Sequence, residues 1–213
     1  MGRVSQDGPS SRPRRPTLFG PVALDAVVGG ADPAERIEAA HATAEALVRH
    51  GRDADDATTA RLVALTDEHG IDEVADLWSD RPPDSLPGAL WRLYALRAGI
   101  RQDPDGHARA FEAGRHRAPV HEVVAGVGEP PGPQEVLALA DAVLAGAFSA
   151  DLAVALERAG AFCRVVSTGS AVLADDEQDP AAAEARTRRA AGLQRTGAQL
   201  ERGAARWRDG ELT

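Results

Sequence analysis

Apolar residues recur along most of this chain at steps of three and four, which is the spacing of one face of an α-helix. Between residues 32 and 50 such a stripe is formed by Ile37, Ala40, Ala44, Leu47 and Val48. Asp32 precedes the stripe as a helix N-cap, Pro33 suits the first helical position, and Glu35 completes the pattern of a capping box. We therefore predict a helix that begins at Asp32 and ends before Gly51.

The same spacing predicts helices over most of the remaining chain, separated by glycine or proline residues. These segments are residues 53–69, 71–78, 86–102, 103–116 and 133–148, followed by a helix that Ser149 caps. In segment 86–102 the apolar positions are Leu90, Trp91, Tyr94, Leu96 and Ile100. The helix after Ser149 carries a regular stripe of Leu152, Leu156, Ala159, Phe162, Cys163 and Val166. Since no segment requires a β-strand, the predicted fold class is all-α: an irregular multi-helix bundle with helical hairpins and a C-terminal docking helix.

Composition divides the chain into four parts. Residues 1–16 are rich in Arg, Ser, Pro and Gly and lack an apolar period, so we predict a disordered N-terminal tail. Residues 17–172 form the predicted helical domain, and residues 173–179 form a predicted acidic linker. Asp179 and Pro180 repeat the capping signal seen at Asp32 and begin a predicted C-terminal helix over residues 180–209.

The C-terminal helix has a heptad-like apolar seam. Its members are Ala190, Leu193, Gly197, Leu200, Ala204 and Trp207. The seam is too short, and its side chains too small, for a free coiled coil, so we expect this helix to dock on the body of the chain or on a partner. Leu193, Leu200 and Trp207 are the candidate partner-binding residues.

The charge distribution changes the expected partners. The net charge is −9, yet residues 1–20 and 181–213 each carry an excess of three arginines over acidic residues. The segment between them is therefore strongly acidic and repels a nucleic-acid backbone. All 24 basic residues are arginines, which is typical of a GC-rich genome. We interpret the basic side chains Arg186, Arg188, Arg189 and Arg195 as a solvated face, and nucleic acid is not the expected partner.

Glu38 and His41 give the sharpest metal-like signal, because a Glu and a His three residues apart share a helix face, as in di-iron bundles. Those bundles require a second such pair and two further glutamates, and Glu45 alone does not complete the set. Metal binding through Glu38 and His41 therefore stays an alternative to a solvated helix face. Cys163 lies on an apolar stripe and is interpreted as a core residue. We find no phosphate-binding loop and no nucleophile elbow, and we predict no cofactor.

No stretch of 18 apolar residues is present, so we predict no transmembrane helix and a cytoplasmic location. Arg14 and Arg15 imitate the start of a twin-arginine export signal. Asp25 and the prolines at positions 16 and 21 interrupt the apolar run that such a signal needs.

One short region resembles a single tetratricopeptide unit. Trp91, Ala95, Phe111, Gly114 and Pro119 match its large, small, aromatic, small and proline positions. Ala98 and His107 depart from the pattern, and no second copy follows. The resemblance therefore implies a helical hairpin rather than a repeat array.

The segments PTLFGPVALDAVVGG, LPGALWRLYALR, VAGVGEPPGPQEVLALADAVL and DLAVALERAGAFCRVVSTGSA carry a wider resemblance. Over residues 16–208 the chain resembles a group of short actinobacterial proteins, some of which are labelled RNA polymerase β subunit. The residues do not support that label, because a β subunit is several times longer and no catalytic or nucleic-acid channel motif is present. The resemblance implies a helical, cytoplasmic, actinobacterial protein and brings no catalytic residues with it.

These observations predict a non-enzymatic protein that acts through protein–protein interaction or regulation. Its expected contact is an unidentified protein partner, or self-association through the C-terminal helix. The first alternative is a transcription-associated accessory factor that uses its basic ends. The second is a metal-binding helical protein built around Glu38 and His41.

Overall fold

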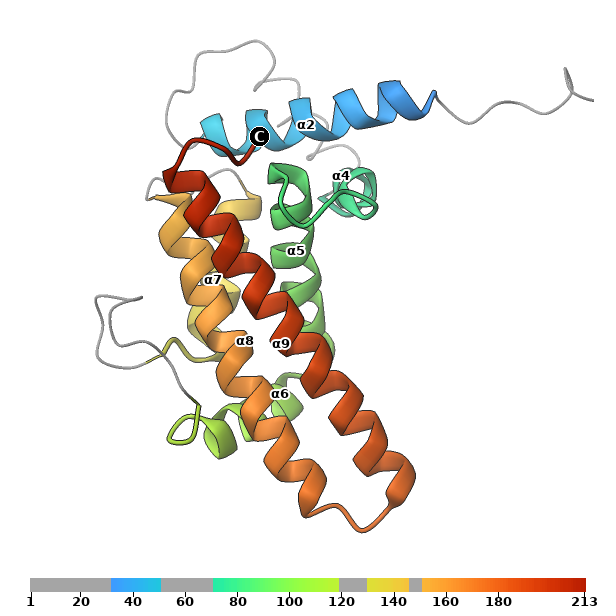
Figure 1. Ribbon diagram of the computed structural model, residues 1–213, viewed down its shortest axis with the longest axis vertical. Helices are drawn as coiled ribbons and strands as arrows, with labels where there is room; N and C mark the ends of the chain where they lie inside the picture. The colour runs from blue at the N-terminus through green and yellow to red at the C-terminus, as the bar shows by residue number, and fades with distance from the viewer. Residues whose placement is uncertain (1–31, 51–70, 119–129, 146–150) are drawn as a thin grey trace, which may run out of the picture. The chain divides into compact units, whose positions relative to one another are not determined.

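A computed structural model describes residues 32–50, 71–118, 130–145 and 151–213 of the chain. The predicted helix over residues 53–69 and the predicted tail over residues 1–16 lie outside these ranges. The regular structure of the described residues consists of helices α2 (Pro33–His50), α4 (Ile71–Trp78), α5 (Leu86–Gln102), α6 (Pro104–Gly114), α7 (Pro133–Leu144), α8 (Leu152–Asp175) and α9 (Pro180–Arg208) (Figure 1). Within these ranges there is no β-strand, so the predicted all-α fold class is confirmed.

Aspartate side chains begin three of these helices by accepting hydrogen bonds from backbone N–H groups of the first turn. Asp103 accepts from Gly106 N at 2.9 Å, and Asp179 accepts from Ala181 N at 3.1 Å. These N–H groups have no partner inside the helix, so each aspartate stabilises its helix start by about 1 kcal/mol. The predicted cap of α8, Ser149, is wrong: the helix begins two residues later, where Asp151 is the N-cap.

Helix α8 forms the centre of the core. All six residues of its predicted apolar stripe are buried, and most of the helix from Leu152 to Ser170 is buried on the remaining faces as well. It packs against α6, α7 and α9, and its contact with α9 is the most extensive between any two described helices. A helix covered on several sides needs apolar or small residues around its whole circumference, and the alanines and glycines of α8 meet this requirement.

The C-terminal boundary differs from the predicted one. Helix α8 continues to Asp175, so residues 173–175 of the predicted acidic linker are helical, and the turn before α9 spans residues 176–179. Helices α8 and α9 run side by side as a helical hairpin (Figure 1). The described residues between Pro33 and Thr213 form one compact unit, so α9 is part of the same packed body rather than a separate element on a linker.

Glycines set the distance between α8 and its neighbours. A Cβ atom added to Gly169 would lie 1.7 Å from the backbone oxygen of Ala110 in α6, and one added to Gly114 would lie 2.0 Å from the backbone oxygen of Val165 in α8. The two helices therefore touch backbone to backbone. Where α8 meets α9, a Cβ atom added to Gly197 would lie 3.0 Å from the Cβ atom of Cys163.

Helix α5 packs against α2, α4, α7 and α9, and makes only slight contact with α6. The hairpin implied by the tetratricopeptide resemblance is therefore not formed, because α6 packs mainly on α8 instead. The predicted apolar positions Trp91 and Tyr94 are half-buried, whereas Leu93, which the predicted stripe omitted, is fully buried. The C-terminus folds back on this helix, where the backbone oxygen of Thr213 accepts a hydrogen bond from Leu86 N at 3.0 Å.

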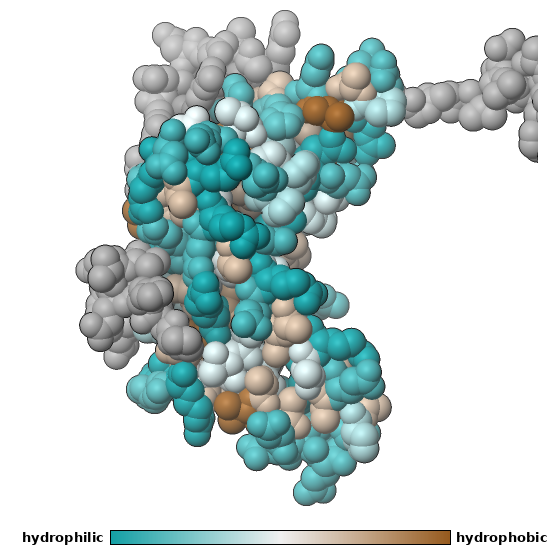
Figure 2. Space-filling view, viewed as in Figure 1, coloured by the Kyte–Doolittle hydropathy of each residue, from teal (hydrophilic) through white to brown (hydrophobic). Residues whose placement is uncertain are grey.

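The visible surface is mostly hydrophilic, with hydrophobic residues scattered singly over it (Figure 2). The only large hydrophobic side chains exposed among the described residues are Ile37 and Val154. None of the described helices is both long enough and apolar enough to span a bilayer.

Candidate functional site

A cleft of about 270 Å³ lies between α6, α8 and the N-terminal half of α9. Its lining residues are Asp103, Gly106, His107, Arg109, Ala110, Val166, Ser170, Ala182, Ala185, Arg186 and Arg189. They come from three stretches of the chain that are far apart in sequence. The close backbone contact between α6 and α8 forms the base of this arrangement, because it brings His107 and Ser170 to one cleft.

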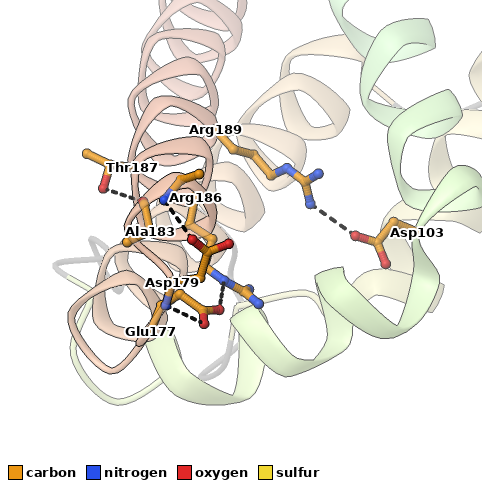
Figure 3. Close-up of polar contacts among 8 residues, drawn as sticks. Asp103, Glu177, Asp179, Ala183, Arg186, Thr187 and Arg189 are labelled. Carbon is orange, nitrogen blue, oxygen red and sulfur yellow. Dashed lines mark hydrogen bonds and ion pairs between the residues drawn. The ribbon is translucent and has the colours of Figure 1, made fainter.

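Arg189 extends from α9 to the start of α6, where its Nη1 donates to Asp103 Oδ2 at 3.0 Å (Figure 3). The other carboxylate oxygen of Asp103 accepts the capping hydrogen bond from Gly106 N. A Cβ atom on Gly106 would lie 2.2 Å from Asp103 Oδ2, so this carboxylate position requires glycine at 106. The Gly106 N–H and the Arg189 guanidinium together hold the pKa of Asp103 below its usual value.

Two further arginines bring positive charge to the cleft. Arg186 Nε donates to Glu177 Oε2 at 3.2 Å, in the turn before α9, which leaves its two Nη groups available (Figure 3). Arg109 is exposed on α6 and makes no ion pair with any residue that the structure describes. The lining therefore carries three guanidinium groups and one carboxylate, on a protein whose net charge is −9.

His107 and Ser170 are the buried polar side chains of the cleft, with exposed fractions of 7% and 5%. His107 Nδ1 lies 2.8 Å from the backbone oxygen of Asp103, and a carbonyl oxygen only accepts, so Nδ1 carries the proton. The imidazole ring stacks on Phe162 of α8 with a centroid distance of 6.4 Å. The Ser170 hydroxyl makes no hydrogen bond with the described residues and faces the cleft. Ala110, Val166, Ala182 and Ala185 supply the apolar part of the lining.

The predicted partner-binding residues lie elsewhere, on the side of α9 that faces α8 and the core. Leu200 is completely buried within the chain, so no partner can reach it while α9 is docked. Leu193 and Trp207 are half-buried and pack against the core. Trp207 Nε1 also donates to Asp151 Oδ1 at 3.1 Å, which ties the end of α9 to the start of α8. The apolar seam of α9 thus docks on the body of its own chain.

Most arginines of α9 form ion pairs, one with an acidic residue of the same helix and four with acidic residues that precede it in the chain. Arg186, Arg188 and Arg189 bind Glu177, Glu184 and Asp103, while Arg206 and Arg208 bind Asp84 and Glu157. The positive excess of this end therefore folds onto the acidic residues of the chain. These contacts therefore do not leave a continuous stripe of unpaired arginines that could bind the phosphate backbone of a nucleic acid.

The metal-like pair does not gain further ligands in the structure. Glu38 is exposed and His41 is half-buried on α2. Among the described residues, no group of three or more His, Cys, Asp and Glu side chains is close enough to hold a metal ion. Cys163 is completely buried, and burial raises the pKa of its thiol to about 12, so it packs as an apolar side chain.

The sequence pointed to part of this cleft without identifying it. Arg186 and Arg189 are three residues apart, a spacing that places both on one helix face, and Asp103 begins the predicted helical segment 103–116. His107 drew attention only as a departure from a repeat pattern, and no sequence signal singled out Arg109 or Ser170. No protein-family model matches this chain, and no curated protein or solved structure is significantly similar to it.

Proposed function

We propose that the protein is a non-enzymatic regulatory protein that acts by binding, and that the arginine-lined cleft holds an anionic group of its ligand. The observation that carries this proposal is the charge of the lining: three guanidinium groups against one carboxylate. Guanidinium groups bind oxyanions through paired N–H donors, and they do so more strongly where a concave surface limits access to water.

The acidic body sharpens the contrast between the cleft and the rest of the surface. A net charge of −9 repels anions from most of the protein, while the local excess of arginine attracts them to one place. This contrast favours a small anion over a polyanion, because the flanking charges of a polymer would meet the acidic body. A cytoplasmic location is part of the proposal, since the single buried cysteine requires no oxidising compartment.

Thermal unfolding of the full-length protein with added anions tests this proposal. Sulfate, phosphate and citrate are added at constant ionic strength, which sodium chloride maintains. A ligand at ten times its Kd stabilises the folded state by about 1.4 kcal/mol, which raises Tm by roughly 3–6 °C for a protein of this size.

The decisive comparison is between two double variants with the same loss of positive charge. Arg109→Gln/Arg186→Gln removes donors from the cleft, whereas Arg188→Gln/Arg195→Gln changes exposed arginines of α9 outside it. We expect the first variant to lose the anion-dependent rise in Tm and the second to keep it. Equal responses of the two variants would show that the anions act on overall charge, and the proposal would be withdrawn.

A protein partner is the second candidate, and one observation favours it. Residues 33–38 at the start of α2 are all exposed, and the Ile37 side chain among them is 45% exposed. Because Cys163 is buried, Ile37→Cys can carry a single photo-crosslinker, with Ala191→Cys on the exposed side of α9 as the control. We expect one crosslinked species from position 37 and none from position 191 in cell extract. Identical products from both positions would contradict a specific surface on α2.

A further inference from the structure

The position of Asp103 shows where the cleft stabilises negative charge. One of its oxygens accepts from a backbone N–H at the start of α6, and the other accepts from the Arg189 guanidinium. Backbone N–H groups at a helix N-terminus and arginine side chains are the two donor types that bind phosphate most often in proteins. Asp103 thus supplies an anionic partner to these two donors, and an added anion depends on the other donors of the cleft.

Several donors around the cleft have no partner within the described residues. Ser170 is 5% exposed, lines the cleft and makes no hydrogen bond with the described residues, so its hydroxyl is available to solvent or to a ligand in the cleft. Arg109 has no ion pair, and the Nη groups of Arg186 remain available. These donors come from α6, α8 and α9, so they approach a bound group from three directions.

The charge and the donors of the lining select among oxyanions. Three arginines and one aspartate line the cleft, and Glu177, which lies outside the lining and pairs with Arg186, lowers their excess of two positive charges to one. A phosphate monoester carries a charge of about −1.5 to −2 at pH 7 and has three acceptor oxygens. A carboxylate has only two oxygens, so it would leave more of the N–H and O–H donors of the cleft without an acceptor.

The size of the cleft sets the rest of the ligand. A volume of about 270 Å³ equals that of roughly nine water molecules in the liquid. It is slightly smaller than the usual pocket for a drug-sized molecule, which begins at about 300 Å³. Next to the arginines, Ala110, Val166, Ala182 and Ala185 form an apolar wall that suits a short carbon skeleton.

We infer that the cleft binds the phosphate monoester of a small organic molecule. Arg109, Arg186 and Ser170 hold the phosphate oxygens, and the apolar wall contacts the carbon skeleton. The inference rests on the proposed anion-binding function and specifies the class of its ligand. Asp103 keeps Arg189 extended across the cleft and repels the phosphate, so its neutral variant Asp103→Asn binds more tightly.

Isothermal titration calorimetry on the full-length protein at pH 7.5 and constant ionic strength tests this inference. The probes are glycerol 3-phosphate, its carboxylate counterpart glycerate, and inorganic phosphate. We expect glycerol 3-phosphate to bind at least ten times more tightly than glycerate and several times more tightly than inorganic phosphate.

Four variants locate the binding. We expect Arg109→Gln/Arg186→Gln to weaken glycerol 3-phosphate binding at least tenfold, and Ser170→Ala to weaken it at least threefold. Asp103→Asn should strengthen it, because asparagine keeps the helix cap and removes the negative charge. The control Arg188→Gln/Arg195→Gln should stay within twofold of the original protein.

The possible failures are distinguishable. Arginine-dependent binding of glycerate at equal or higher affinity would overturn the phosphate inference and leave the anion-binding function standing. Inorganic phosphate binding as tightly as the ester would remove the carbon skeleton from the inference. If no probe binds in a manner that depends on Arg109 and Arg186, the inference and the proposed function fail together.

Discussion

Substitution of glycine by alanine should destabilise the protein at Gly169, where α6 and α8 touch backbone to backbone, and stabilise it at Gly192, where there is open space. Gly169→Ala places a Cβ atom 1.7 Å from the backbone oxygen of Ala110, and neither atom belongs to a flexible side chain. The separation would have to double to reach an ordinary contact of 3.4 Å, so the two helices must move apart. Such movement also disturbs the stacking of Phe111 on Phe162, whose ring centroids lie 5.9 Å apart across the same interface.

The expected magnitude follows from two opposing effects. Overpacking in a core costs about 1–3 kcal/mol, and more where backbone atoms collide. Alanine has a higher helix propensity than glycine by about 1 kcal/mol, which offsets part of this cost. Because backbone atoms collide here, we expect the overpacking to cost about 3–5 kcal/mol. Subtracting the gain in helix propensity of about 1 kcal/mol leaves a net loss of about 2–4 kcal/mol, equivalent to a fall in Tm of roughly 5–15 °C for a chain of this length.

Gly192 of α9 is the matched control, because nothing lies within 4 Å of a Cβ atom added there. Gly192→Ala should therefore stabilise the protein by up to about 1 kcal/mol through helix propensity alone. Urea unfolding measures both variants, and unchanged m-values would show that the free energies are comparable. A Gly169→Ala protein as stable as the original, or shifted in the same direction as Gly192→Ala, would refute the backbone contact.

Three further predictions follow from the same structure. Because the pKa of Asp103 is lowered in the folded protein, its carboxylate contributes stability above the unfolded pKa of about 3.9, and this contribution is lost as the pH falls through the folded pKa. The Asp103→Asn variant should therefore lose less stability than the original protein between pH 6 and pH 2.5. Parallel curves of Tm against pH for the two proteins would contradict this. Because the Cys163 thiol is completely buried and its pKa is raised, it should not react with a thiol reagent in the folded protein at pH 8 and should react fully in urea. Fast labelling of the folded protein would show that the packing around Cys163 opens to solvent. A chain ending at Asp175 should be less stable and prone to aggregation, because it exposes the face of α8 that α9 covers. Urea unfolding measures the stability, and light scattering measures the aggregation. A stable truncated monomer derived from a full-length dimer would instead show that α9 is an oligomer interface.

The local features of this chain follow closely from its sequence. The 3.6-residue apolar period and the Asp-Pro capping signals predicted α2, α4, α5, α6 and α9 to within a few residues, because both act within one or two helical turns. The shift of the α8 start from Ser149 to Asp151 reflects two capping residues of similar strength, between which the cap preferences do not decide.

Tertiary packing decided what the sequence left open. The seam of Leu193, Leu200 and Trp207 showed that α9 must cover an apolar surface, but period alone does not distinguish a surface of the same chain from that of a partner. The structure supplies the answer through the glycines of α8 and α9, which let the two helices approach, and through the buried Leu200.

The cleft likewise depends on tertiary packing. Arg109, Ser170 and Arg186 are distant along the chain, and only the backbone contact of α6 with α8 and the docking of α9 bring their side chains together. Sequence periodicity reports which face of a helix avoids water, whereas the identity of its neighbours depends on which surfaces fit at close range.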